Sequence, residues 1–407
     1  MQVAEKRNEP GWGPMIGFAL HGAGTGTAMK MIKVGIPAVM CVVALSMAAG
    51  VIAWTQATAD DLGTPEEACV EVDAASLDAC LDAEFAKQER TIIATRAYQI
   101  WLADRLAEDG GARNLALALH LRHRALAAPE VLNQADVVNQ ADHAADEIDG
   151  LLSNWMDKAS AGAGHDGVVW ALLASTAELP LMPKPHGVDL THAWAEAEPD
   201  NLTPLLMRMR SQDDAAMIFA ALDVRSRHAI YWDEVQALGL HAVERHPPKA
   251  QWRDEMPAFF KAGHEHFGTE LASALALPLY QHLMAACKPP LIDTKFDRRA
   301  QCSRLGTMLQ DRADTLIGRF IGNALLRFSA DSDAARATAE VARNRLRWRQ
   351  SRVQAHQGAA YDAAYQAALR EGGPFDETML IDRALKAVGV ELSEPPDDWV
   401  PDVVSPK

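Results

Sequence analysis

Apolar side chains recur at the spacing of an α-helix along most of this chain, and this pattern constrains the fold more than any other feature. One stripe runs from Leu77 through Phe85, Tyr98 and Leu102 and stops at Asp109-Gly110-Gly111. Steps of three or four residues between apolar positions place them on one face of a helix. Alternating runs of β-branched residues, which would predict strands, are missing from residues 60–407. The sequence therefore predicts an all-α fold.

Gly, Pro and Asp-Asn punctuate the apolar stripes and divide the chain into expected helices. Beyond the first stripe and the Ala/Leu-rich segment that opens at Asn114, we expect helices over residues 202–210, 212–224, 231–238, 259–266, 271–287, 305–326, 334–370 and 379–388. Together they predict an irregular solenoid or bundle of antiparallel helical hairpins over residues 60–390. The Pro-rich residues 391–407 are expected to form a disordered tail.

The N-terminal region has the features of a membrane-targeting segment. No charged residue lies between Lys33 and Asp60, and residues 34–54 are apolar over a length that crosses a bilayer core of about 30 Å. A short basic stretch precedes this segment, and the Ala-x-Ala pattern of residues 57–59 follows it. Residues 29–59 are thus either a cleaved signal peptide or a retained transmembrane anchor. Residues 1–28 are expected to be a leader, and translation from Met29 would leave them out.

The cysteines agree with export. Apart from Cys41 in the apolar segment, the chain holds Cys69, Cys80, Cys287 and Cys302, an even number in a chain directed to an oxidising compartment. Four cysteines allow three pairings. We expect Cys69 to bond to Cys80 and Cys287 to Cys302, because each pair brackets a turn signal. The Cys-x2-Cys spacing of structural zinc sites is absent, so no metal is expected.

One segment resembles a known family. Residues 193–201, Ala-Trp-Ala-Glu-Ala-Glu-Pro-Asp-Asn, resemble the end of the second helix of a tetratricopeptide repeat and its junction with the next unit. The resemblance covers about one repeat, and residues 202–210 lack the Leu-Gly and Tyr positions of that family's first helix. That family stacks helical hairpins into a curved solenoid that binds other proteins. The resemblance implies a protein-interaction role and carries over no catalytic residue.

Composition and motifs exclude several classes of function. With 39 Lys plus Arg against 55 Asp plus Glu, the acidic chain is not expected to bind nucleic acid. His264 and His266 flank Glu265, but they are two positions apart instead of the four that a zincin helix requires. No nucleophile elbow, phosphate-binding Gly loop or haem signature occurs in residues 60–407. No cofactor is expected.

One basic cluster is a candidate interaction surface. It consists of Arg343, Arg345, Arg347, Trp348, Arg349 and Arg352. Arginine with an interleaved Trp suits an acidic protein partner or an anionic lipid surface. The alternative is a solvated helix face, because arginines at these positions spread around a helix and acidic residues of the same chain can pair with them.

These observations predict an extracytoplasmic, periplasmic scaffold that binds a protein partner, and that contacts the membrane through residues 34–54 if they are retained. The alternative is an exported helical enzyme whose active site is not recognisable from the sequence.

Overall fold

The computed structural model describes residues 69, 76–127, 138–177, 189–253, 255–256, 275–294, 297–372, 375–392, 394–396 and 399. Within them the chain forms helices, two isolated bridges and no strand, so the all-α prediction is confirmed for this part of the protein. None of the helices described here combines the length and apolar character needed to span a bilayer. The predicted leader, the apolar residues 34–54 and the cleavage pattern at 57–59 lie outside the described residues, as do residues 264–270.

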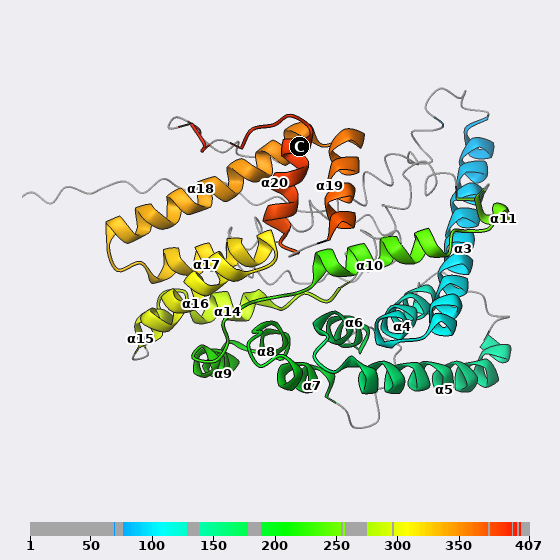
Figure 1. Cartoon of the computed structure of the whole chain (residues 1–407), viewed down its shortest axis with the longest axis horizontal. Helices are drawn as coiled ribbons and strands as arrows, with labels where there is room; N and C mark the ends of the chain where they lie inside the picture. Colours follow the sequence, from blue (N-terminus) through cyan, green and yellow to red (C-terminus); the bar gives the residue numbers. More distant parts are fainter. Residues whose placement is uncertain are drawn as a thin grey trace, which may run out of the picture.

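The first group of helices forms hairpins between neighbours in sequence. α3 packs on α4, α4 packs on α5 and α6, and α6 packs on α7. Figure 1 shows this group in blue to green. The helices are α3 (Leu77–Asp109), α4 (Ala112–Ala127), α5 (Val138–Ala163), α6 (Gly167–Ala177) and α7 (Leu190–Ala197).

A second group follows, and its strongest pairing is the hairpin of α16 on α17, with α18 packed on the outer side of α17. Its helices are α8 (Thr203–Met207), the 3-10 helix η2 (Gln212–Asp214), α9 (Ala215–Ala221), α14 (Tyr280–Ala286), α15 (Leu291–Thr294), α16 (Arg298–Arg312) and α17 (Leu316–Ser329). The C-terminal helices are α18 (Asp333–His356), α19 (Ala359–Glu371) and α20 (Glu377–Ala387), of which α19 and α20 form a hairpin.

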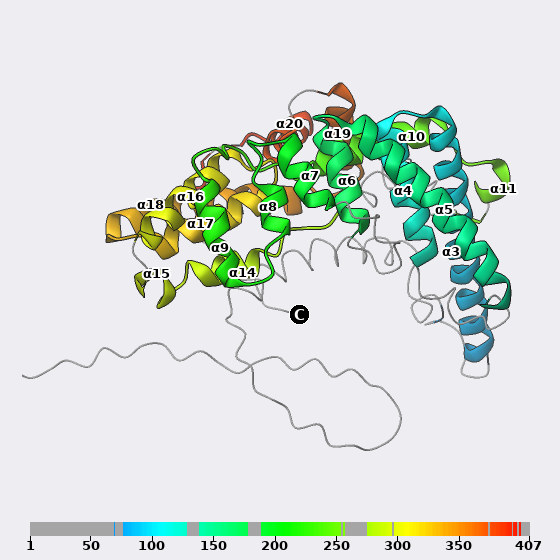
Figure 2. The same cartoon turned by 90° about the horizontal axis from the view of Figure 1, so that it is seen from below.

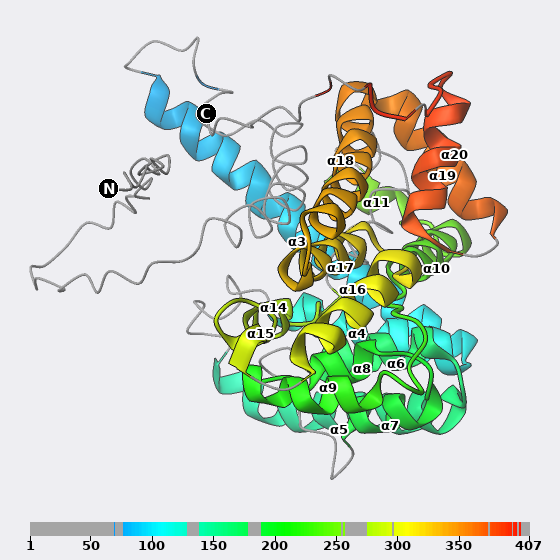
Figure 3. The same ribbon diagram turned by 90° about the vertical axis from the view of Figure 1, so that its left-hand side faces the viewer.

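Two large apolar cores lie side by side. One is built mainly from α3 to α7, and the other from α8, α9, α14, α16 and α17. The elongated molecule places α3 to α5 at one end and α15 and α18 at the other (Figure 2). Viewed from the side, α18 to α20 cover one face and α5 to α9 the other (Figure 3). α10 (Trp232–Arg245) joins these parts, since it contacts α3, α6 and α19, and α11 (Ala250–Arg253) packs on α3.

Local signals set several helix ends as the sequence predicts. α3 ends at Asp109 because Gly110 adopts φ 71°, a backbone conformation that favours glycine, and its N–H bonds back to the carbonyl of Leu106. Ser211 caps the next predicted start: its hydroxyl accepts from the N–H of Asp213, and the Asp214 side chain accepts from the N–H of Ser211. Trp170 and Trp194 are buried in the first core, between neighbouring helices.

Four expected helix boundaries were wrong. The stripe over residues 305–326 is two helices, α16 and α17, because the chain turns at Ala313 and the Thr315 side chain accepts the N–H of Gly318 to begin α17. The expected helix 334–370 is likewise broken at Gln357 and Gly358 into α18 and α19. The helix expected to end before Gly239 continues to Arg245, and the one expected to reach back to residue 271 begins only at Tyr280.

Two glycines allow α16 and α17 to approach at backbone contact. A Cβ atom on Gly306 would lie 2.9 Å from the carbonyl oxygen of Gly322. A Cβ atom on Gly322 would lie 2.7 Å from the carbonyl oxygen of Gly306 and would overlap the backbone nitrogen of Gln310. Both distances are shorter than van der Waals contact, so larger residues would push the two helices apart.

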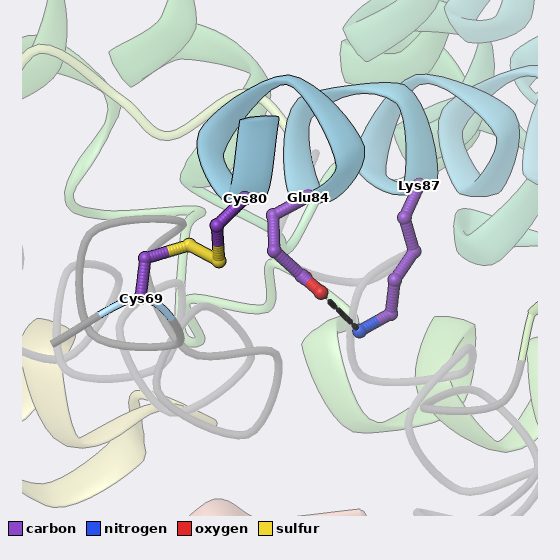
Figure 4. The surroundings of a disulfide bond; sticks show 4 residues. All are labelled: Cys69, Cys80, Glu84 and Lys87. Carbon is purple, nitrogen blue, oxygen red and sulfur yellow. Dashed lines mark hydrogen bonds and ion pairs between the residues drawn. A yellow bond between two sulfur atoms is a disulfide. The ribbon is translucent and has the colours of Figure 1, made fainter. Parts of the chain in front are cut away.

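Both predicted disulfides are present. Cys69 bonds to Cys80, with Cα atoms 5.9 Å apart, and Cys287 bonds to Cys302, with Cα atoms 5.8 Å apart. The first bond fixes Cys69 against the first turn of α3, one turn before the Glu84–Lys87 ion pair (Figure 4). The second joins the end of α14 to the first turns of α16. Two local disulfides are typical of proteins in an oxidising, extracytoplasmic environment.

Candidate functional site

The connection between α9 and α10 lies at the junction of the two apolar cores. Its residues 226–231 run beside two other segments, through isolated parallel bridges from Arg227 to Asn201 and from His228 to Ala313. The N–H of Leu202 donates to the carbonyl of Arg227 over 3.0 Å, and the N–H of Asp314 donates to the carbonyl of His228 over 3.0 Å. Polar side chains gather on both sides of this connection.

On one side, the carboxylate of Glu198 is 5% exposed and accepts four hydrogen bonds. Trp194 Nε1 and Asn201 Nδ2 donate to Oε2 over 2.6 and 3.2 Å. Arg227 and the hydroxyl of Tyr231 both donate to Oε1. Four donors occupy the lone-pair positions of a carboxylate. Glu198 therefore has no acceptor left for a substrate and acts as an anchor for the surrounding segments.

The same side is completed by contacts to backbone groups. Asn201 Oδ1 accepts from the N–H groups of Thr203 and Ala229 over 3.1 and 3.0 Å, while its Nδ2 donates to the carbonyl of Ala229. Arg225 donates to the carbonyls of Glu198 and Asn201 just beyond the end of α7. A cation at a helix C-terminus satisfies carbonyls that lack helical partners. Residues 193–201 thus carry most of this network.

Tyr231 connects the two sides. Its φ of 66° is rare for an aromatic residue, and the carboxylate of Asp314 holds this conformation by accepting the N–H groups of Ile230 and Tyr231 over 2.7 and 2.9 Å. Burial raises the pKa of the Tyr231 hydroxyl. Close approach of α6 is possible only because residue 167 is Gly, since a Cβ there would overlap the Tyr231 hydroxyl.

On the other side, a buried Tyr–His pair faces Asp314. The hydroxyl of Tyr280 lies 2.8 Å from His228 Nε2, and both side chains are buried. His228 Nδ1 is 3.9 Å from Asp314 Oδ1, which is too long for a hydrogen bond, and within the described chain neither atom has another partner. Burial lowers the pKa of His228 to about 4 and raises that of Asp314 to about 7, with Glu377 adding to the second shift.

Three more carboxyl groups lie near Asp314. Glu377 accepts the N–H of Leu316 over 2.6 Å, and burial raises its pKa to about 7. Asp233 accepts a hydrogen bond from the Tyr365 hydroxyl over 2.8 Å, and burial raises its pKa well above the usual range. Burial also raises the pKa of Glu234 to about 8.

Converging helix ends explain why this many acids are tolerated. Asp233 and Glu234 lie in the first turn of α10, Glu377 begins α20, and its carboxylate binds the first N–H of α17. Each helix N-terminus carries about half a positive charge and unpaired N–H groups. The N-termini of α10, α17 and α20 meet here. Their N–H groups and partial positive charges partly replace the stabilisation that water would give the acids.

The junction combines a dense set of structural hydrogen bonds with carboxyl groups whose pKa values are raised by burial. A carboxyl with a pKa near neutrality suits general acid–base catalysis, but such a group must also reach a substrate. Asp233, His228 and Tyr280 are buried, and Asp314 is largely so. No group of three or more potential metal-binding side chains is present in the described part of the chain.

The structure spreads the predicted arginine cluster along α18 and pairs most of it internally. Trp348 contacts Trp399 at 5.3 Å between ring centroids, so part of the segment expected to be a disordered tail lies on α18. Arg347 is partly buried, which lowers its pKa. The other contacts are Arg343 with Glu340, Arg345 with Glu394, Arg349 with Asp382, and Arg352 over the Trp348 ring. Acidic residues of the same chain thus pair with three of these arginines.

Sequence reasoning missed the junction. A signal for Glu198 was present, since it follows Trp194 by one helical turn within residues 193–201. Asp314-Thr315 before an apolar run is also a helix-start signal, and it marks the break between α16 and α17. The convergence of the acids had no sequence signal, because Asp233, Asp314 and Glu377 lie far apart in the chain.

Comparison with known protein families, with curated proteins and with solved structures finds no match to this chain.

Proposed function

We propose that this chain is an exported helical scaffold that binds a protein partner through the first half of α3, with tetratricopeptide-like hairpins as its framework. The observation that carries this proposal is the uneven exposure of α3. Its second half supplies Tyr98, Leu102 and Leu106 to the first core. Its first half leaves Phe85 56% and Ile93 55% exposed.

Four of the eight large apolar side chains that are exposed in the described chain lie on this half-helix: Leu77, Phe85, Ile92 and Ile93. Leu77, Phe85 and Ile92 fall within about 80° of one another around the helix axis. Figure 3 shows these turns of α3 extending away from the layers of helices. Apolar side chains that gather on one exposed face mark an interaction site, whereas scattered ones do not.

The charges beside this face indicate the partner. Residues 77–93 carry Asp78, Asp82, Glu84 and Glu89 but only Lys87 and Arg90 as cations. An amphipathic helix of the partner, with an apolar stripe flanked by basic residues, would complement both features. The Cys69–Cys80 disulfide beside this face supports export, and residues 34–54 either direct the chain out of the cytoplasm or also anchor it.

A photo-crosslinking residue at Phe85 tests the proposal in the native membrane fraction, with Val224, which is 66% exposed on another part of the molecule, as the control position. We expect a crosslinked partner at Phe85 but not at Val224, and weaker crosslinking at high salt. The crosslinked peptide should be amphipathic and basic. Equal products at both positions, or a polar acidic peptide, would contradict the proposal.

The alternative of an exported enzyme would need an accessible reactive group. The groups with pKa values shifted toward neutrality in the described chain lie in the junction around Asp314, away from the exposed face of α3.

A further inference from the structure

The α19–α20 hairpin has a small apolar core of its own. Tyr361, Ile381, Ala384 and Leu385 pack with one another, and a second small cluster holds Leu369 and Leu380. From the remainder of the chain, Leu316 and Val353 pack against it while being only partly buried themselves. The attachment of this hairpin to α10 and α17 therefore depends strongly on polar contacts.

Most of those contacts involve acids. Tyr365 donates to Asp233 at the start of α10, the N–H of Leu316 donates to Glu377, and the N–H of Glu377 donates to the carbonyl of Asp314 over 2.8 Å. At the edge, Arg319 pairs with Asp376, while Arg370–Glu244 and Arg349–Asp382 are half-exposed ion pairs. Exposed pairs of this kind contribute little.

The charges facing these acids do not balance them. Glu234, Asp314 and Glu377 each raise the pKa of Asp233, Asp314 also raises that of Glu234, and Glu377 raises that of Asp314. Opposing cations are Arg319, which acts on Glu377 while it binds Asp376, and Arg113 and Arg227, which act on Glu234. The other faces are lined by His228, Tyr280, Tyr361 and Tyr365, whose pKa shifts favour the uncharged forms.

Two buried polar atoms at this site lack a hydrogen-bond partner among the described residues and could share a proton. His228 Nδ1 and Asp314 Oδ1 face each other at 3.9 Å without partners in the described chain, and His228 is fully buried. A proton on either atom would give the pair a donor, and a small movement would close the gap. A neutral imidazole keeps one N–H, so two acceptors face each other only when that proton lies on Nε2 and Asp314 is ionised.

We propose that Asp233, Asp314 and Glu377 form a proton-controlled latch, which holds the α19–α20 hairpin on α10 and α17 more tightly in neutral or mildly acidic medium than in alkaline medium. The ligand of this site is the proton. An extracytoplasmic protein meets the pH of its surroundings, so such a latch would convert external pH into hairpin position.

The direction follows from proton linkage. Asp314 and Glu377 keep their protons up to a pH of about 7 while the hairpin is docked, but lose them at a pH near 4 once it opens to water. The open form therefore binds fewer protons between these values, and opening becomes more favourable as the pH rises. Below pH 6.5 an exposed His228 binds a proton that the buried one does not, which makes opening more favourable as the pH falls. The test therefore uses the range above pH 6.

Amide hydrogen exchange of the full chain, corrected for the intrinsic effect of pH on exchange, measures the opening directly. From pH 6 to 8.5 we expect the opening equilibrium of α19 and α20 to rise by at least roughly tenfold, because each acid that keeps its proton up to pH 7 when docked contributes about a factor of ten over the one pH unit from pH 6 to pH 7. Peptides from α4 and α6 should not follow. Equal pH dependence throughout the chain, or none in the hairpin, would overturn the proposal.

Isosteric variants assign the effect to the acids. Glu377→Gln keeps an acceptor for the N–H of Leu316, and Asp233→Asn keeps one for Tyr365, but neither can ionise. Each should reduce the pH dependence of hairpin opening severalfold. Glu371→Gln, on the exposed surface of α19, is the matched control and should behave like the parent. If both buried variants keep the full pH dependence, the latch is excluded; if one fails to fold, the other decides. These readings need no partner, so they are independent of the crosslinking result.

Discussion

The two sides of the Tyr231 junction each bury a carboxyl group, but they give it different sets of hydrogen-bond donors. Glu198 is a buried carboxylate with four donors, two of them from Arg227 and Tyr231. Asp314 accepts two backbone N–H groups and has one oxygen without a partner in the described chain. A buried charge with a complete set of donors fixes structure, whereas a buried acid with an incomplete set is poised to bind a proton. We therefore assign rigidity to the Glu198 side and pH response to the Asp314 side.

The largest expected effect comes from removing Glu198. Glu198→Ala leaves Trp194 Nε1 and the Tyr231 hydroxyl without their acceptor, removes one of the two acceptors of Asn201 Nδ2, and leaves Arg227 without a buried partner. We expect a loss of about 3–5 kcal/mol in the free energy of unfolding, the range for breaking a buried pair. Urea unfolding measures it. Glu196→Ala, two residues earlier in the last turn of α7 and exposed, should change stability little, and equal effects of the two variants would contradict the anchoring role.

A smaller loss is expected when the same side is crowded. Gly167→Ala places a methyl group against the Tyr231 hydroxyl and 2.5 Å from Glu198 Oε2. Overpacking of this kind costs about 1–3 kcal/mol. Gly150→Ala is a useful control, because a Cβ atom there meets nothing within 4 Å. Thermal unfolding of the two variants should differ clearly. A Gly167→Ala protein as stable as the parent would show that the surrounding groups can move to accommodate the methyl group at no cost in stability.

The Asp314 side should reveal itself through pH. In the parent, burial raises the pKa of Asp314 from about 4 in the unfolded chain to about 7, so this group lowers stability progressively from pH 4 to pH 7 and by a constant amount above pH 7. Asp314→Asn cannot ionise. Its stability relative to the parent should therefore increase from pH 6 to pH 8, by on the order of 1–2 kcal/mol. Urea unfolding at both pH values checks this, and a constant difference would exclude the assigned titration.

The smallest effect is expected from the α18 arginines, which belong to neither the Glu198 side nor the Asp314 side of the junction. Arg345 pairs with Glu394 while more than half of each side chain is exposed. Such pairs contribute about 0–1 kcal/mol, so Arg345→Ala should change the unfolding free energy by less than about 1 kcal/mol. Urea unfolding of Arg345→Ala and, in parallel, of Glu394→Ala measures this change. A larger loss would mean that the C-terminal residues stabilise α18 more than an exposed ion pair can.

The sequence determined those features that neighbouring residues settle between themselves. Helical periodicity gave the all-α class, Gly110 ended α3, Ser211 capped η2, and each disulfide closed a short local loop. These depend on backbone conformation and on contacts between residues no more than 15 positions apart, so a local pattern contains the information. The break at Ala313 was not predicted. The Thr315 cap is a local signal, but the apolar stripe continues on both sides of it and favoured a single helix.

Only the tertiary structure decided where the buried polar groups meet. Arg227 and Tyr231 follow Glu198 by 29 and 33 residues, and Tyr365 follows Asp233 by 132. Desolvation by the two cores sets the raised pKa values of Asp314 and Glu377, and the convergence of three helix N-termini makes those acids tolerable. Both effects depend on how helices distant in sequence pack together, and a one-dimensional pattern of apolar and charged residues carries no measure of that packing.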